Sequence, residues 1–151
     1  MSVEHQDAMY DHILVPTDGS AGSVKAAEHA VDLAEKYSGD IHALYVVNVG
    51  RLEGMSLNVP GSIDRLEEEG KEYIQDVVDT AENAGVEATS AIELGRPAKT
   101  IIEYADENGS DLIVIGTQGR GGLSRRLLGS VTEQVVRLAN VPVHTVRAGE
   151  D

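Results

Sequence analysis

The sequence predicts an α/β fold, a single domain across residues 1–151 built on an open five-stranded parallel sheet with helices on both faces. Short apolar segments alternate along the chain with longer segments of helical periodicity, which is typical of this class. The apolar segment at residues 41–47 contains almost no polar residues, as expected for a strand covered on both faces. A length of 151 residues suits one domain with its own core.

The first strand is expected at 10–15, where an apolar run is followed by Pro16. A helix at 21–37 follows, because its apolar residues recur at helical spacing. Gly39 is expected to take the left-handed conformation just past the end of this helix. The second strand is expected at 41–47. Residues 48–61 contain three glycines, one proline and two asparagines, and are expected to form the longest loop.

The second half of the chain continues the alternation of helix and strand. Its elements are expected as a helix at 62–84, a strand at 86–93, a helix at 97–108, a strand at 111–115, a helix at 131–139 and a strand at 141–147. Gly85 ends the first of these helices. Pro97 takes the first position of the next helix, where its missing N–H costs no hydrogen bond. Pro142 suits an edge strand. Residues 1–8 and 148–151 are expected to be flexible tails.

The strongest functional signal is a strand end, a glycine-rich loop and a helix start between residues 113 and 133. The apolar run ends at Gly116, and residues 116–122 include four glycines. Ser130 and Glu133 have the spacing of a capping box, which predicts that a helix begins there. Glycines let backbone N–H groups approach an anion, and the helix N-terminus adds a positive dipole end. The segment therefore predicts a phosphate-binding site.

The charge distribution singles out the same segment. The chain carries a formal net charge of −14, yet residues 116–151 hold five arginines and only three acidic residues. Arg120, Arg125 and Arg126 flank the glycine loop, where they could contact an anionic ligand or remain solvated surface cations. The acidic residues are spread through residues 1–115. We favour the interpretation that they maintain solubility at high salt, as in halophilic proteins; attraction of a cationic partner is the alternative.

Two distant segments are expected to form one ligand site. In an open parallel sheet, ligands bind beyond the carboxyl ends of the strands, where the strand order reverses. If the order is 3-2-1-4-5, the first and fourth strands are neighbours at that reversal. Residues 16–20 would then face residues 116–119.

Composition and missing motifs exclude several classes. With no cysteine, the chain has no disulfide, thiol nucleophile or cysteine zinc site. A pI near 4.6 argues against a nucleic-acid partner. No apolar run approaches the roughly 20 residues of a membrane span, and the polar N-terminus is unlike a signal peptide, so we expect a cytoplasmic protein without membrane contact. The sequence motifs of P-loop ATPases, Rossmann dinucleotide sites and hydrolase nucleophile elbows are absent.

The glycine spacing resembles the signature of the universal stress protein family. Gly116, two residues, Gly119, nine residues and Gly129-Ser130 match its Gly-2x-Gly-9x-Gly-Ser/Thr pattern. The resemblance extends over about residues 9–147 and includes Pro16-Thr17-Asp18, Leu128-Gly129-Ser130-Val131-Thr132 and Val141-Pro142-Val143. It implies the 3-2-1-4-5 sheet of a Rossmann-like, adenine nucleotide alpha hydrolase-like fold. It also implies homodimers paired through the last strand, between Val141 and Arg147.

The resemblance further implies an adenine nucleotide ligand, ATP or else ADP or AMP, with or without Mg²⁺. Asp18 would lie near the ribose or near a phosphate linked to magnesium, and Val46 would pack on adenine. Gly116 and Gly119 would allow the ribose and phosphates to approach, with Gln118 beside them. The phosphates would be bound by Gly129, Ser130 and Val131. The full set of implied contacts is Pro16, Thr17, Asp18, Val46, Gly116, Gln118, Gly119, Gly129, Ser130, Val131 and Thr132.

Several of these residues also have a purely structural interpretation. Asp18 could order a turn or cap a helix, and Ser130 could serve only as a helix cap. The glycines could allow close packing alone, and Val46 lies in a strand that needs apolar residues anyway.

The sequence is compatible with three alternative functions. The leading hypothesis is a nucleotide-dependent regulatory or stress-response module that binds ATP. A slow ATPase is the second, although efficient hydrolysis needs a metal clamp and a charge-stabilising group, and Asp18 is the single candidate carboxylate. A nucleotide-free dimeric interaction module is the third; family members of that kind lose the glycine signature, which this chain keeps.

Overall fold

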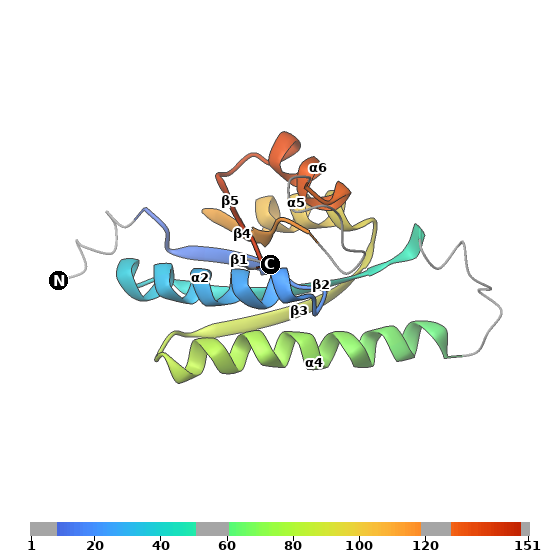
Figure 1. The fold of residues 1–151 in the computed structure, drawn as a ribbon, viewed down its shortest axis with the longest axis horizontal. Helices are drawn as coiled ribbons and strands as arrows, with labels where there is room; N and C mark the ends of the chain where they lie inside the picture. The colour runs from blue at the N-terminus through green and yellow to red at the C-terminus, as the bar shows by residue number, and fades with distance from the viewer. Residues whose placement is uncertain (1–8, 51–60, 119–127, 149–151) are drawn as a thin grey trace.

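The structure, a computed structural model, describes residues 9–50, 61–118 and 128–148. Its strands form one parallel sheet in the order β3-β2-β1-β4-β5 (Figure 1). The strands are β1 (His12–Pro16), β2 (Asp40–Asn48), β3 (Ala88–Gly95), β4 (Leu112–Gly116) and β5 (Val143–Val146). The predicted fold class and strand order are confirmed.

Helices cover both faces of the sheet. Helices α2 (Ala21–Tyr37) and α4 (Ser62–Asn83) lie on one face, and α5 (Pro97–Glu107) and α6 (Ser130–Leu138) lie on the other (Figure 1). Every helix in the described part of the chain is too short or too polar to cross a bilayer.

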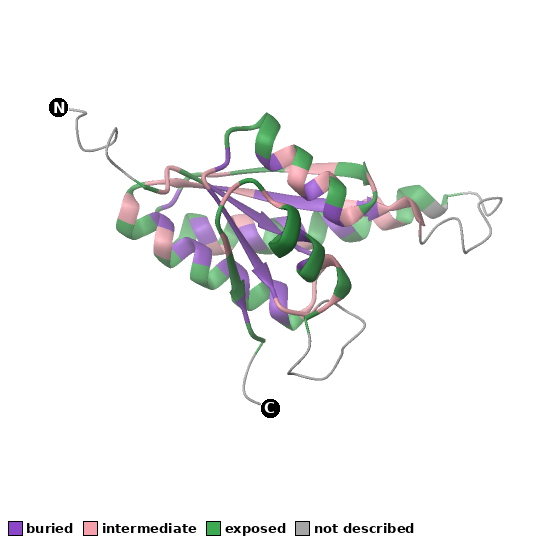
Figure 2. Ribbon diagram, turned by 90° about the horizontal axis from the view of Figure 1, so that it is seen from above, coloured by how far each residue is buried: buried purple, intermediate pink, exposed green. Residues whose placement is uncertain are grey.

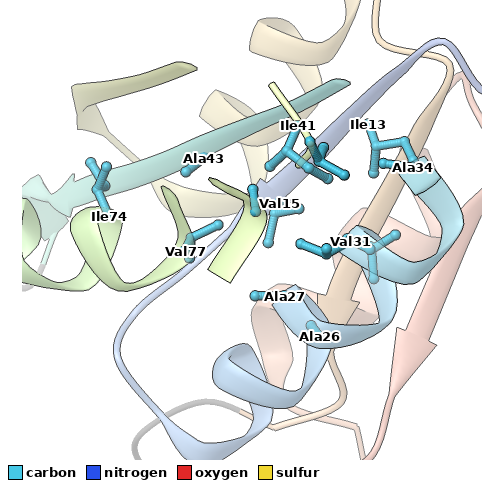
Figure 3. Packing of buried hydrophobic residues seen from close by; sticks show 14 of the residues in the cluster. Ile13, Val15, Ala26, Ala27, Val31, Ala34, Ile41, Ala43, Ile74 and Val77 are labelled. Atoms are coloured by element: carbon cyan, nitrogen blue, oxygen red, sulfur yellow. The ribbon is translucent and has the colours of Figure 1, made fainter. Parts of the chain in front are cut away.

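Two apolar cores lie on the two faces, because successive side chains of a strand point in opposite directions. Ile13 and Val15 of β1 pack toward α2 and α4, together with Ile41 and Ala43 of β2 (Figure 3). Leu14, between them, packs into the α5–α6 core. The inner strands are therefore apolar on both faces and buried along most of their length (Figure 2). Each fully buried Ile or Leu contributes about 1.5–3 kcal/mol relative to an exposed one.

Several helix ends follow the sequence signals. Helix α2 has the predicted bounds, and Pro97 is at the start of α5. Gly85 follows α4 with φ +77°. The prediction for Gly39 is wrong, because Ser38 takes the left-handed conformation, with φ 58°. Gly39 is required for another reason: a Cβ there would lie 2.4 Å from the carbonyl oxygen of Tyr10.

Other boundaries differ from prediction by a few residues. Strand β2 continues to Asn48, and residues 49 and 50 are helical, so the predicted loop at 48–61 begins later than expected. Residues 51–60 lie outside the described residues, as do most of the predicted tails. Strand β3 starts at Ala88 rather than at 86, because the Val86 N–H instead donates to the Ala81 carbonyl in the turn after α4.

Two histidines near the amino end of the sheet have opposite electrostatic surroundings. The ring of His42 joins β2 to β3 and α5, with Nδ1 2.8 Å from Thr89 Oγ1 and Nε2 2.5 Å from the Tyr104 hydroxyl. Burial lowers the pKa of His42, against a smaller raising effect of Asp40. His12 is more exposed, and its Nδ1 lies 3.0 Å from Asp40 Oδ1. That hydrogen bond raises the pKa of His12.

The two histidines should give opposite pH dependences of stability. Because the pKa of His42 is lowered in the folded protein, the unfolded chain binds a proton at His42 more readily than the folded chain does. The contribution of neutral His42 to folding stability is therefore complete above pH 6.5, the ordinary pKa of histidine, and is lost as the pH falls below that value. The raised pKa of His12 gives stabilisation that is complete below 6.5 and is lost as the pH rises through its folded value. Urea unfolding of His42→Gln and His12→Gln between about pH 5 and pH 8 measures both effects.

Relative to wild type, we expect His42→Gln to lose most stability near neutral pH. His12→Gln should lose most under acidic conditions. The same pH trend in both variants would contradict these assignments.

Candidate functional site

The segment after β1 is held by hydrogen bonds to its own side chains and to β2. The Thr17 N–H donates to the Leu44 carbonyl at 2.9 Å. The buried Thr17 hydroxyl donates to Ser23 Oγ at 3.1 Å and accepts from the Gly19 N–H at 3.2 Å. Thr17 therefore supports the turn from the inside. Pro16 before it is also buried, at the end of β1.

Asp18 orders the next part of this turn. Its Oδ1 accepts a hydrogen bond from the Ser20 N–H at 2.9 Å, and the residue is half-buried. Ser20, not Asp18, caps α2 by accepting from the Ser23 N–H at 3.2 Å. The structural interpretation of Asp18 as a turn residue is therefore confirmed. A ligand contact by the same carboxylate remains a prediction.

An aromatic pair braces the turn from the side of α4. Gly19 has φ +80°, and a Cβ there would lie 2.4 Å from the ring of Tyr73. The Tyr73 ring in turn contacts that of Tyr45, with centroids 5.8 Å apart. Gly70 allows α4 to approach this pair, because a Cβ there would lie 2.3 Å from the Tyr45 ring. The position of the turn thus depends on α4 as well as on β1.

The two glycine-containing segments meet through direct backbone contact. A Cβ on Gly116 would lie 2.7 Å from the carbonyl carbon of Gly22, in the first turn of α2. A Cβ on Gly22 would lie 2.9 Å from the Gln118 carbonyl oxygen. The structure thus brings the start of α2 against the end of β4, and the predicted neighbourhood of β1 and β4 is confirmed.

The start of α6 is fixed to the same strand end. The Gly129 N–H donates to the Thr117 carbonyl at 2.7 Å, and the Thr132 hydroxyl donates to the Gly116 carbonyl at 2.7 Å. The Thr117 N–H donates to the Val146 carbonyl at 2.9 Å, which ties this point to β5. Thr132 is buried, and this bond gives its hydroxyl a structural partner.

The capping box predicted for α6 is wrong. Gly129 is the N-cap, with φ −63° and ψ 157°, and no side chain caps the helix. Ser130 is already the first helical residue, so its hydroxyl is one position too late to cap. The Glu133 carboxylate lies 3.2 Å from Arg137 instead of reaching back. The first N–H groups of a helix lack partners within it, so this exposed end, with Ser130 on its surface, can receive an anion.

Apolar residues lie near the carboxyl edge on the α5–α6 face. Val46 of β2 is half-buried, and it packs against the α5–α6 core, as does Val131 of α6. Gln118 is half-buried after β4. Gly119, Arg120, Arg125 and Arg126 lie outside the described residues. Within residues 9–50, 61–118 and 128–148, no group of three or more His, Asp or Glu side chains could hold a metal ion, so Asp18 has no such companions there.

Sequence reasoning missed two positions that shape this region. Gly22 is a glycine inside a helical segment, which signals a packing or functional constraint, but the partner it contacts is not visible in the sequence. Tyr73 lies in the apolar stripe of α4, and nothing in its spacing distinguishes a core tyrosine from one that covers Gly19.

Comparisons with known proteins agree with the observed fold. Residues 9–147 match the model of the universal stress protein family. Universal stress protein MJ0531 of Methanocaldococcus jannaschii is 38% identical over 147 residues, which cover 96% of this chain and 86% of the relative. The structure of MJ0577 from the same organism superposes with a TM-score of 0.84 at 29% identity, covering 95% of this chain and 99% of that one.

A crystal structure of a universal stress protein in complex with cAMP has a TM-score of 0.73 at 26% identity and covers 93% of this chain and 99% of that one. The family match, the extent of the sequence identity and the shared strand order lead to one conclusion. The chain belongs to the universal stress protein family.

Proposed function

We propose that this protein binds ATP at the carboxyl edge of its sheet and acts as a nucleotide-dependent regulatory module in a stress response. One observation carries the proposal: the backbone contact of Gly22 with Gly116, which sets the start of α2 and the turn before it beside residues 116–118, to which the start of α6 is hydrogen-bonded. This arrangement supplies an N-terminal helix end, a polar turn and an apolar wall at the reversal of strand order. The cAMP complex of a related protein supports an adenine nucleotide as the ligand class.

In this proposal the phosphates bind at the start of α6. The N–H groups of Ser130 and Val131 point out of the first turn, and the helix dipole favours negative charge there. The Ser130 hydroxyl adds a donor at an exposed position. Gly129 precedes the helix in an extended conformation that leaves no side chain at the cap. Gly119 belongs to the proposed phosphate site by its place in the signature.

The nucleoside would lie toward β1 and β2. Val46 offers an apolar surface for adenine, and Asp18 contacts either the ribose or a Mg²⁺ ion bound to the phosphates. Pro16 and Thr17 hold the turn that presents Asp18. Gly116 and Gln118 form the neighbouring wall, and Thr132 secures α6 through the Gly116 carbonyl. ADP and AMP would share most of these contacts.

Binding, rather than rapid turnover, is the proposed activity. Phosphoryl transfer needs a positioned nucleophile and neutralisation of the developing charge, and Asp18 is the single carboxylate that the proposal places in the site. The proposed assembly is a homodimer paired through the edge strand β5 and its flanking residues, from 141 to 147. Mass spectrometry of nucleotide released from the purified protein, with titration calorimetry, tests the proposal directly. Absence of adenine-nucleotide binding would refute it.

Ser130→Ala should weaken ATP binding without unfolding the protein. Ser130 is exposed at the first position of α6, and alanine is a good helix former. Loss of a hydrogen bond to a charged phosphate costs about 1.5–3 kcal/mol, so we expect the Kd for ATP, measured by calorimetry, to rise by about tenfold or more. Ser90→Ala is the matched control, because Ser90 is an exposed serine of β3 that the proposal leaves out of the site. Equal weakening in both variants would argue against a phosphate contact.

Asp18→Asn separates the two proposed roles of Asp18. Asparagine keeps a side-chain oxygen for the Ser20 N–H, so the turn should persist while the charge is removed. We expect about tenfold weaker binding of ATP in the presence of Mg²⁺. A loss confined to Mg²⁺-containing buffer indicates a metal-linked contact, and an equal loss in EDTA indicates a ribose contact. Unchanged affinity for ATP in both buffers would show that the Asp18 carboxylate does not contact the nucleotide or its metal ion.

A further inference from the structure

Two exposed histidines from opposite ends of the chain face each other at the edge of the sheet. His29 lies on α2 and His144 on β5, and their ring centroids are 5.8 Å apart with the planes inclined at 53°. Both residues are exposed. Neither histidine belongs to the proposed nucleotide site.

The fold explains why these rings meet. Strand β5 alternates, so that Val143 packs toward the α5–α6 core and Val146 toward the core under α2. His144 shares the orientation of Val146, and therefore points to the face that α2 covers. His29 precedes Ala30, which is fully buried in that same core. Its ring lies on the flank of α2 beside β5.

The separation of the rings suits a shared metal ion. Two imidazoles that bind one tetrahedral ion through nitrogens at about 2.0–2.1 Å have ring centroids roughly 5–6 Å apart. The rings are exposed, so small rotations about their side-chain bonds can aim a nitrogen of each at a common point. Imidazole nitrogen favours Zn²⁺, Cu²⁺ and Ni²⁺ over Mg²⁺ or Ca²⁺, which prefer oxygen ligands.

We propose that His29 and His144 chelate one divalent transition-metal ion, with water in the remaining coordination positions. Among the described residues, no third His, Asp or Glu joins the pair in a metal-binding group, which is why water completes the coordination. The ion would join the first helix to the last strand of the sheet. Strand β5 is the four-residue edge strand of the described chain, and a link to α2 would add to its pairing with β4. The homodimer proposed above would pair the backbone edge of β5, which leaves the His144 side chain on the face that α2 covers.

Zinc titration of the full-length, chelator-treated protein by calorimetry tests the proposal, with no nucleotide present. We expect one Zn²⁺ per chain in wild type. His29→Asn and His144→Asn should each bind at least about tenfold more weakly, because each loses one of two protein ligands. Saturating Zn²⁺ should raise the melting temperature of wild type but not of the double variant. His12→Asn is the matched control, since His12 is another exposed histidine, and it should bind Zn²⁺ as wild type does.

Several results would overturn the proposal. These are wild-type affinity in the double variant, a stoichiometry of one ion per two chains, or equal weakening in His12→Asn. Melting in EDTA shows whether each variant is folded. A measurement on wild type alone complements the variants: electron paramagnetic resonance of the protein with one equivalent of Cu²⁺ should show coupling to two imidazole nitrogens. Coupling to one would exclude the chelate. Because ATP binding plays no part in these readouts, their failure would leave the proposed function untouched.

Discussion

The fold and the candidate site both depend on the contact between Gly22 and Gly116. A side chain at either position would collide with the backbone of the other segment at less than 3 Å. The absence of both Cβ atoms lets α2 begin directly against the end of β4, so that two segments nearly a hundred residues apart form one surface. Glycine is often explained by its freedom at positive φ, but neither glycine has a positive φ here. Close approach is the reason for both.

Hydrogen bonds then extend this surface to α6. The Thr132 hydroxyl and the Gly129 N–H bind the carbonyls of Gly116 and Thr117, so the helix is anchored by its first turn rather than by a capping side chain. An end anchored in this way keeps a fixed direction and still presents N–H groups that lack helical partners. On the other side, Thr17 and Asp18 hold their turn through local bonds. The described parts on both sides are therefore held in place by contacts within the protein, which would lower the ordering cost of binding the nucleotide that we propose.

Much of the fold was predictable because its signals are local and repeated. Buried strands are visible in the sequence as apolar runs, and α2 is visible from the helical spacing of its apolar residues. Pro97 marks the start of α5 and Gly85 the end of α4, and each of these signals is confined to a few residues. The proximity of the segments after β1 and β4 followed from the strand order 3-2-1-4-5, which was first assumed and was then implied by the resemblance to the family. Errors arose where neighbouring residues compete for one role: Ser38 rather than Gly39 took the left-handed position, and Gly129 rather than Ser130 became the cap of α6. The contacts of Gly22, Tyr73 and Thr132 join distant segments, so no window of sequence contains both partners.

The aromatic brace beside the turn has a practical consequence. The chain has no tryptophan and no phenylalanine, and its five tyrosines supply all of its intrinsic near-ultraviolet emission. Tyr45 and Tyr73 are in ring contact, and Tyr73 covers Gly19. Movement of that turn changes the environment of a natural chromophore pair. The molecule thus carries its own optical probe at the carboxyl edge of the sheet, and local rearrangements there can be followed without an attached dye.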